Sequence, residues 1–407
     1  MKGLPHRTYM ELALRIAYDR MGTTSPNPPV GAVIVKDGVI LATGGTGPWG
    51  THHAEKAALI AAGPAAGDAD MYVSLEPCSH HGKTPPCTEA IIRAGIRKVI
   101  IPILDPNPLV SGRGVAELRG AGVEVVFTED MADGAVDMLR PFRKYILRKR
   151  PFILSKSAVT LDGRIAAVSG DSKWISSEIS RYLTHRIRAK VDAVIVGKNT
   201  FMCDNPSLTV RLDSFSGEAG SYFQEHRPLI LGRDNFFLRS LAAEPVTEFS
   251  QPLRVVMGLP ERIETGSNLF SDDNYIFYER RDVAERLAER SPGFREVLDR
   301  FNNRLLDVAG PGEGVAAVLA DLAERNVTMA LLEGGGRLTG SFFDAGEIDQ
   351  FLYIITPKIV GDGVPSLVGK GADSIAAAAR LRDVSVMPVG EDLLYTGYRE
   401  PYHFEML

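Results

Sequence analysis

Residues 53–62 read HAEKAALIAA, and residues 71–87 read MYVSLEPCSHHGKTPPC. The first run predicts a helix that ends at Gly63, because a glycine commonly follows the last helical turn. The second run begins as a strand over 71–76 and continues into a polar, proline-rich loop over 77–87. Strands that alternate with helices predict a layered α/β sheet, with functional side chains in the loops where strands end.

The segments on either side extend this alternation. Asp37-Gly38 separates two strand-like runs, a signal of a two-residue hairpin turn. The N-terminal residues have apolar positions at helical spacing and lack the apolar stretch of a signal peptide, so they predict an amphipathic helix. The remaining elements expected in this half are strands at 30–36 and 39–44, a helix near 88–94, and strands near 98–103 and 123–127.

The two halves meet at residues 140–151 (RPFRKYILRKRP), which carry six basic side chains between two prolines. Such a run can contact nucleic acid, but we interpret it as a solvated connecting segment. We therefore predict one domain over 1–147 and a second over 148–407.

The second half also alternates strands with helices. We expect residues 213–226 and 260–310 to be polar and irregular, with weak strand signals near 229–232, 254–258 and 274–278. The stronger predictions are strands at 152–159, 192–197, 327–333, 351–356, 383–387 and 393–398, and helices at 177–190 and 313–325.

The composition fits a two-domain globular protein of 407 residues with a net charge of -5. The negative balance argues against a nucleic-acid partner, and no apolar run approaches the roughly 20 residues that span a bilayer. Three cysteines do not form a disulfide framework, and Cys78 and Cys87 lie within one motif, which indicates metal binding in a reducing compartment. We expect a cytoplasmic location.

The strongest chemical signal is His53, Cys78 and Cys87 together with Glu55. One nitrogen and two sulfurs match a catalytic zinc site, which uses three protein ligands and leaves a fourth position for water. Zinc makes a bound water acidic near neutral pH, and a carboxylate that is not a ligand must then carry protons. Glu55 follows His53 by two residues on the same helix and suits that task.

The His-x-Glu and Pro-Cys pattern is a described signature of nucleobase deaminases, which usually separate their two cysteines by two residues. Here eight residues (SHHGKTPP) separate Cys78 from Cys87, which argues against the nucleic-acid editing enzymes. The alternative is a zinc ion that only braces the loop, with His80 or His81 as a fourth ligand. We interpret His52 as a bystander.

Longer strings carry a family resemblance. SPNPPVGAVIVKDG, HHAEKAAL, LEPCSHHGKTPPC and DPNPLVSGRG in the first half, and SAVTLDGRIA, SGDSKWIS, DNPSLTVR, LLEGGGRLTGSF and PKIVGDG in the second, resemble the bifunctional riboflavin-biosynthesis deaminase–reductases. The resemblance implies a cytidine-deaminase-like α/β/α layered domain, followed by a dihydrofolate-reductase-like α/β domain. It also implies zinc-dependent deamination of a phosphorylated pyrimidine and NADPH-dependent reduction of its ribosyl group to ribityl.

For the first domain, the resemblance implies that His53, Cys78 and Cys87 bind Zn²⁺ and that Glu55 is the proton carrier. The substrate contacts that it implies are Asn27, His80 and Lys83. Asn27 has an amide that can both donate to and accept from a pyrimidine edge. This chain departs from the family at Thr46, where many members carry a histidine, so the loop 44–52 is expected to contact substrate differently.

For the second domain, no Gly-x-Gly-x-x-Gly follows the first strand, which makes a Rossmann fold a weak reading. Instead Glu333 and three glycines end a strand and open a helix, where backbone amides can approach a phosphate, although tight packing also explains such glycines. The implied NADP contacts are Ala158, Trp174, Thr200, Asp204, Gly335, Gly336, Arg337, Leu338, Thr339, Gly340 and Ser341. The implied substrate contacts are Ser172, Arg188, Leu208, Arg211 and Glu333, and both arginines are expected to hold phosphate. The roles of Lys156 and Asp162 stay open.

Two other functions compete with this one. The chain could be a nucleoside or tRNA deaminase with a non-catalytic C-terminal binding domain, or a zinc-braced nucleotide-binding module without activity. The acidic balance and the cysteine spacing oppose the first, and Glu55 has no evident task in the second. We expect an enzyme that forms a homo-oligomer and acts on a small phosphorylated pyrimidine, without nucleic acid or membrane partners.

Overall fold

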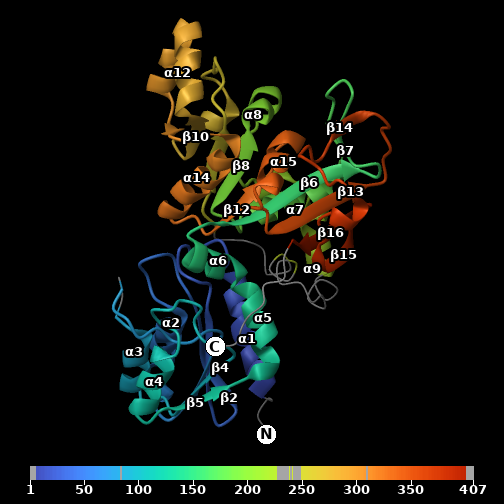
Figure 1. Cartoon of the computed structure of the whole chain (residues 1–407). Helices are drawn as coiled ribbons and strands as arrows, with labels where there is room; N and C mark the ends of the chain where they lie inside the picture. Colours follow the sequence, from blue (N-terminus) through green and yellow to red (C-terminus); the bar gives the residue numbers. More distant parts are fainter. Residues whose placement is uncertain are drawn as a thin grey trace. The chain divides into compact units, whose positions relative to one another are not determined.

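A computed structural model of the chain describes residues 6–82, 85–226, 238, 241, 249–308 and 310–399 (Figure 1). The chain divides into two compact units, one formed mainly by residues up to Lys149 and the other mainly by residues from Arg150 onward. None of the helices in the described ranges combines the length and apolar character needed to cross a membrane.

The first unit contains a five-stranded sheet in the order β2-β1-β3-β4-β5. The hairpin expected around Asp37-Gly38 is present, and both of these residues have positive φ angles. β1 is antiparallel to β2 and β3, whereas β3, β4 and β5 are parallel, so their carboxyl ends meet at one edge. The strands are β1 (Gly31–Lys36), β2 (Val39–Gly45), β3 (Asp70–Val73), β4 (Lys98–Ile101) and β5 (Glu124–Phe127).

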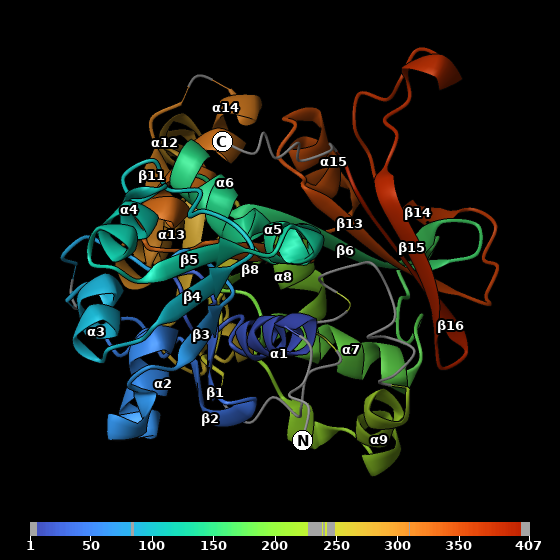
Figure 2. The same cartoon turned by 90° about the horizontal axis from the view of Figure 1, so that it is seen from below.

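Helices cover both faces of this sheet, so the unit has three layers (Figures 1 and 2). α1 and α5 lie on one face, and α2, α3 and α4 lie on the other. The apolar stripe of α1 explains its place, because Met10, Ala13, Leu14 and Ala17 recur at helical spacing and are all buried. The helices are α1 (His6–Asp19), α2 (Ala54–Ala62), α3 (Cys87–Arg93), α4 (Arg113–Gly120), α5 (Ala132–Met138) and α6 (Arg140–Arg148).

α6 corrects one expectation from the sequence. The basic run at 140–151 is not a solvated connecting segment, because nine of its residues form a helix with a buried side. Pro141, Phe142 and Lys144 are buried, and Pro141 at the start of the helix suits a position where no backbone donor is needed. The basic side chains alternate with apolar ones at helical spacing, so one helix carries a charged face and an apolar face.

The second unit is built on a nine-stranded sheet in the order β11-β10-β9-β8-β12-β6-β13-β16-β15. The strands from β11 to β13 are parallel, and β16 and β15 add an antiparallel edge. A separate small sheet pairs β14 with β7. The strands are β6 (Phe152–Thr160), β7 (Arg164–Ala167), β8 (Ala193–Gly197), β9 (Leu253–Met257), β10 (Tyr275–Arg280), β11 (Asn303–Leu306), β12 (Met329–Leu332), β13 (Gln350–Thr356), β14 (Gly363–Pro365), β15 (Arg382–Val389) and β16 (Asp392–Tyr398).

Its core forms where apolar residues of the central strands meet helices. Val318, Leu319 and Leu322 of α14 and Phe342 of α15 are fully buried against Ile153 and neighbouring strand residues. The helices of this unit are α7 (Glu178–Arg188), α8 (Lys198–Asp204), α9 (Gly217–Glu225), α12 (Arg281–Arg290), α13 (Pro292–Arg300), α14 (Pro311–Glu324) and α15 (Gly336–Asp344).

Two stretches expected to be irregular are instead regular. The stretch 213–226 contains α9, whose first turn is capped by Ser216, and the stretch 260–310 contains β10, α12, α13 and β11. Their many charged residues lie on exposed helix faces, which conceals the narrow apolar stripes in the sequence. The strand signals near 254–258 and 274–278 correspond to β9 and β10, and the signal near 229–232 lies outside the described residues.

Candidate active sites

The three predicted zinc ligands come from two helix N-termini and one loop. His53 is the residue that precedes α2, and Cys87 is the first residue of α3. Cys78 lies in the loop that follows β3. The N-terminal end of a helix carries a partial positive charge, which favours the thiolate form of cysteine that a metal requires.

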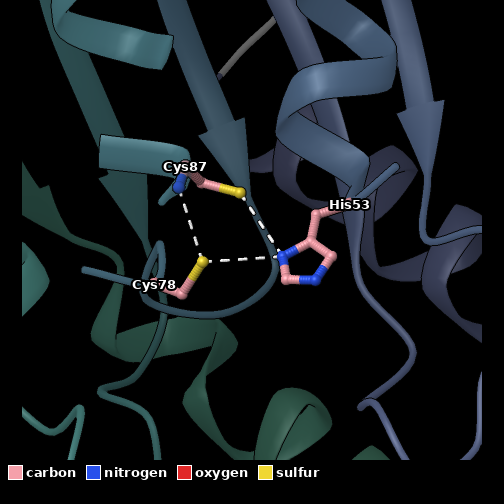
Figure 3. Close-up of side chains that lie close together, drawn as sticks. All are labelled: His53, Cys78 and Cys87. Carbon is pink, nitrogen blue, oxygen red and sulfur yellow. Dashed lines mark hydrogen bonds between the residues drawn. The ribbon is translucent and has the colours of Figure 1, made fainter. Parts of the chain in front are cut away.

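The donor atoms of these residues converge (Figure 3). His53 Nδ1 lies 3.5 Å from Cys78 Sγ and 3.4 Å from Cys87 Sγ, and all three donor atoms lie within 4.8 Å of one another. The backbone N–H of Cys87 donates to Cys78 Sγ at 3.4 Å. The side chain of Cys87, followed by His53 and this backbone hydrogen bond, lowers the pKa of Cys78 to about 4. One imidazole nitrogen and two sulfurs in this arrangement fit a zinc ion that keeps an open position.

Glu55 lies in the first turn of α2 and is only 4% exposed. Burial, together with the negative charge of Cys78, raises the pKa of its carboxyl to about 7. A carboxyl group with a pKa near neutrality can both accept and release a proton at working pH. Its position two residues after His53 places it beside the metal ligands and outside the ligand set.

These residues line one cavity of about 220 Å³. Asn27, His53, Glu55, Cys78 and His80 all contribute to its wall, and Cys87 adjoins it through its contacts with His53 and Cys78. Lys83 lies outside the described residues.

Thr46 also lines the cavity. It is 2% exposed, and its hydroxyl oxygen accepts from the backbone N–H of Val30 at 3.1 Å. This threonine therefore fixes the loop to the start of β1 at the position where many family members place a histidine side chain.

Three polar residues of the cavity escaped the sequence analysis, namely Glu76, Asp105 and Asn107. Glu76 accepts three backbone N–H bonds, from Asp105 at 3.0 Å, Gly112 at 2.9 Å and Val115 at 3.1 Å. Burial raises the pKa of Asp105 to about 7, with further contributions from Glu76 and Cys78. The DPNPLVSGRG string was the signal that could have placed Asp105 and Asn107 in the site.

In the second unit, a buried ion pair holds two predicted substrate contacts together. Arg188, at the end of α7, donates through Nε and Nη2 to the two carboxylate oxygens of Glu333 at 2.7 and 2.9 Å. Desolvation acts to raise the pKa of Glu333, but Arg188 and Lys156 outweigh it and lower the pKa. Desolvation also lowers the pKa of the Lys156 ammonium. Arg188, Lys156 from the middle of β6 and Glu333 after β12 form one charged cluster.

His185 connects this cluster to the loop that carries Leu208 and Arg211. Its Nδ1 accepts from the backbone N–H of Arg211 at 2.9 Å, so this nitrogen carries no proton. Burial, together with the positive charges of Arg188 and Arg211, lowers the pKa of His185 to about 3. Leu208 is buried, whereas Arg211 is exposed. Sequence reasoning missed His185, although it stands three residues before Arg188.

The predicted cofactor contacts fall on several neighbouring segments. Thr200 and Asp204 lie on α8, and a Cβ added to Gly335 would lie 3.8 Å from Thr200 Oγ1. Trp174 is 63% exposed, and the guanidinium carbon of Arg181 lies 4.4 Å from the centre of its ring. Burial raises the pKa of Asp204, and the charge of Lys173, which stands between the predicted contacts Ser172 and Trp174, opposes this increase.

The three-glycine turn combines open and crowded positions. Gly335 precedes α15, and a Cβ there would meet only Thr200. In contrast, a Cβ on Gly336 would lie 2.3 Å from the carbonyl oxygen of Pro365, and one on Gly340 would lie 1.8 Å from that of Val368. Packing therefore requires glycine at 336 and 340, while Gly335 leaves its backbone open. The other predicted contacts on α15 are Arg337, Leu338, Thr339 and Ser341.

An α/β/α layered unit with a zinc-type ligand set, a buried carboxyl and a pyrimidine-sized cavity defines a zinc-dependent deaminase, here joined to a second α/β unit. Comparison with known families agrees. Residues 5–103 match the cytidine and deoxycytidylate deaminase zinc-binding region, and residues 151–395 match the RibD C-terminal domain.

Relatives that match over nearly the whole chain identify its family. The riboflavin biosynthesis protein RibD of Aquifex aeolicus is 36% identical over 395 residues, which cover 95% of this chain and 97% of the relative. RibD of Escherichia coli is 32% identical and covers 95% of this chain and 97% of its own length. The chain belongs to the RibD family of riboflavin biosynthesis proteins, bifunctional enzymes with a zinc-binding deaminase domain and a reductase domain.

Solved structures show the same architecture over the whole chain. A diaminohydroxyphosphoribosylaminopyrimidine deaminase/5-amino-6-(5-phosphoribosylamino)uracil reductase from Thermotoga maritima is similar with a TM-score of 0.76 and 31% identity, covering 97% of this chain and 98% of its own. RibD of Acinetobacter baumannii gives a TM-score of 0.77 at 28% identity, covering 97% and 99%. The expected fold class, a cytidine-deaminase-like domain followed by an α/β reductase domain, is confirmed.

Proposed function

We propose that this chain deaminates 2,5-diamino-6-(5-phosphoribosylamino)pyrimidin-4-one and then reduces the ribosyl group of the product to ribityl with NADPH. The observation that carries the proposal is the cavity that gathers Asn27, Glu55, His53 and Cys78, with Cys87 completing the three-ligand cluster behind its wall. Family membership supports both steps, and the Thermotoga maritima protein is named for this pair of activities.

The deamination is a hydrolysis in which water replaces an amino group that leaves as ammonia. His53, Cys78 and Cys87 would hold zinc, which supplies a Lewis acid that lowers the pKa of the attacking water. Glu55 takes a proton from the water and delivers it to the departing amine, and its raised pKa suits both transfers. The carboxamide of Asn27 pairs with the pyrimidine edge. His80 and Lys83 are proposed to contact the substrate from the loop 77–87.

In the reductase domain, NADPH supplies a hydride to C1 of the ribosyl group, and the protein orients the two reactants. We propose the cofactor contacts on Ala158, Trp174, Thr200, Asp204 and residues 335–341, and the substrate contacts on Ser172, Arg188, Leu208, Arg211 and Glu333. The guanidinium of Arg188 already donates two hydrogen bonds to the carboxylate of Glu333. Arg211, which is exposed, is therefore the arginine better placed to hold the substrate phosphate.

We further propose that residues 1–147 form the deaminase domain and residues 148–407 the reductase domain. The division of the chain near Lys149 and the two family matches support this boundary. A cytoplasmic location is supported by the thiolate ligands, which must stay reduced to bind metal.

We also propose a homo-oligomer, which size-exclusion chromatography with light scattering would test. Val384 and Val386 on the edge strand β15, and Leu393 on the neighbouring strand β16, support it, because they are 42–46% exposed at an edge of the large sheet where a second copy can pair.

Product mass decides the main proposal. The diamino substrate should yield ammonia and a uracil without NADPH, and the ribityl product when NADPH is added. NADPH should be used more efficiently than NADH. Release of ammonia from cytidine or tRNA, but not from this substrate, would overturn the assignment in favour of a nucleoside or RNA deaminase.

A further inference from the structure

α6 contributes three side chains to the deaminase cavity. Phe142, Tyr145 and Ile146 all line it, and their spacing of three and four residues places them on one side of the helix. The side chains that precede and follow them in sequence do not line the cavity. The helix therefore presents an apolar, partly aromatic wall to a cavity whose other groups are mostly polar.

The exposure of these side chains increases along the helix. Phe142 is 7% exposed, whereas Tyr145 and Ile146, one turn later, are half-buried. Lys149, one further turn along, is exposed, and its ammonium lies 5.8 Å from the centre of the Tyr145 ring. Such a cation over an aromatic face helps to fix the orientation of the ring.

The size of the cavity shows why its mouth matters. At about 220 Å³ it is smaller than the roughly 300–1,000 Å³ of pockets that enclose a drug-sized ligand. A pyrimidine ring fits inside, but the sugar phosphate of the proposed substrate must extend through the mouth. Tyr145 and Ile146 are the more exposed residues of the wall that α6 provides.

α6 also lies outside both regions that match known families, since the deaminase match ends at Ile103 and the RibD C-terminal match begins at Pro151. The metal ligands, Glu55 and Asn27 all fall inside the general deaminase region. The chemistry of deamination is therefore supplied by the shared region, whereas α6 is an addition to it that reaches the same cavity.

We propose that α6 is a specificity-determining part of the deaminase site. Phe142 packs against the pyrimidine ring, and Tyr145 and Ile146 contact the ribosylamino substituent as it leaves the cavity. This inference rests on the proposed function, since it names the part of the substrate that α6 contacts.

The test uses full-length, zinc-loaded protein and four variants. Tyr145→Ala and Ile146→Ala shorten the wall, Tyr145→Phe keeps the ring, and Leu147→Ala is the matched control. Leu147 lies on the same helix, is 47% exposed and does not line the cavity. Ammonia release is measured with the phosphoribosylamino substrate and with triaminopyrimidinone, the same base without sugar phosphate. Zinc content and reduction of the deaminated intermediate are measured for every variant.

Loss of an aromatic contact to a ligand should raise KM for the phosphoribosylamino substrate about 5- to 100-fold in Tyr145→Ala, by comparison with base–aromatic stacking. Ile146→Ala should raise it less, and Tyr145→Phe and Leu147→Ala should match the unmodified protein. The effect on triaminopyrimidinone should be much smaller, and zinc content and reduction should not change.

Three results would overturn the inference about α6. These are an unchanged KM in both alanine variants, an equal loss on the two substrates, and a loss that follows zinc content. Failure of the proposed function gives a different result, because the unmodified protein would then release no ammonia from the phosphoribosylamino substrate.

Discussion

Arg188 and Glu333 are 145 residues apart in sequence and form a two-pronged ion pair, with N–O distances of 2.7 and 2.9 Å. Their side chains are only 10% and 12% exposed. The pair joins the end of α7 to the end of β12, where the glycine turn begins. Because both charges are nearly buried, removing either side chain would leave the charge of the other without its partner.

The first prediction removes one partner of this pair. Arg188→Ala should destabilise the reductase domain by roughly 3 kcal/mol, since it leaves a buried carboxylate unpaired. Thermal unfolding measures the loss. The exposed pair of Arg281 and Asp307 provides the control, and Arg281→Ala should destabilise the domain far less than Arg188→Ala. If the two variants are equally stable, the buried pair has no special structural role. Ammonia release should persist in both.

The second prediction concerns the metal. Purified protein should contain about one zinc per chain, and Cys78→Ala or Cys87→Ala should lower that content, because each removes one of three ligands. Metal analysis by mass spectrometry measures the content. Cys203, which is exposed on α8, is the control, and Cys203→Ala should retain zinc fully. Full zinc content in both ligand variants would rule out this site.

The third prediction separates Glu55 from the ligands. Glu55→Gln should keep its zinc and lose roughly 10²- to 10⁴-fold in the rate of deamination, because an amide cannot carry the proton. Initial rates of ammonia release measure the effect, and reduction of the deaminated intermediate should be unaffected. Glu89→Gln, on the outer part of α3, should deaminate normally. A Glu55→Gln variant with a near-normal rate would assign proton transfer to another group.

A feature of the structure can be predicted from the sequence when the residues that determine it lie close together along the chain. The hairpin at Asp37-Gly38, the strand before Cys78 and the ligand set are each encoded within a few residues, and all were predictable. Glu76 was not, because its three backbone partners lie 29 to 39 residues away and only the fold brings them together.

α6 shows a second reason why part of the fold could not be predicted from the sequence, namely that charged residues obscured its apolar side. Its charge suggested a solvated segment, although Phe142, Tyr145 and Ile146 repeat at helical spacing. The same dense charge hid α12 and α13. In each case an exposed charged face dominates the composition, while the narrow apolar side decides the fold.

The fourth prediction is a pH dependence of stability. The pKa of His185 is about 3 in the folded protein, against an ordinary value of 6.5. Between these values the unfolded chain binds the proton and the folded chain does not, so the free energy of unfolding falls as pH drops below 6.5. The positive groups Arg188, Arg211 and Lys156 oppose protonation, and Glu333 favours it.

His185→Gln keeps a hydrogen-bond acceptor for Arg211 and removes the titrating group. The loss of stability of the reductase domain between about pH 7.5 and pH 5 should therefore be smaller in this variant by about 1–2 kcal/mol. Chemical denaturation at each pH measures it. The exposed His52→Gln should not change the dependence. Parallel pH curves for His185→Gln and the unmodified protein would mean that His185 is not held neutral by the fold.

The last prediction tests whether the glycine turn binds the cofactor phosphate or only packs. Gly335 precedes α15 with extended backbone angles, a position at which aspartate accepts hydrogen bonds from the first turn and stabilises a helix. Gly335→Asp should therefore leave the thermal stability unchanged or raise it, because the added Cβ meets only Thr200 at 3.8 Å. Its carboxylate should nevertheless repel a phosphate at the same helix end, so KM for NADPH should rise at least about 10-fold. Gly335→Ser, an uncharged residue that also suits this position, should show a much smaller rise. Ammonia release should be normal in both variants, and unreduced product should accumulate with Gly335→Asp.

A packing role alone would give the opposite pattern, in which stability falls and KM for NADPH does not change. If Gly335 had only a packing role, Gly335→Asp would not leave the protein equally or more stable while it weakens the binding of NADPH. Measuring thermal stability and KM for NADPH on the same two variants therefore distinguishes a phosphate-binding role from a packing role.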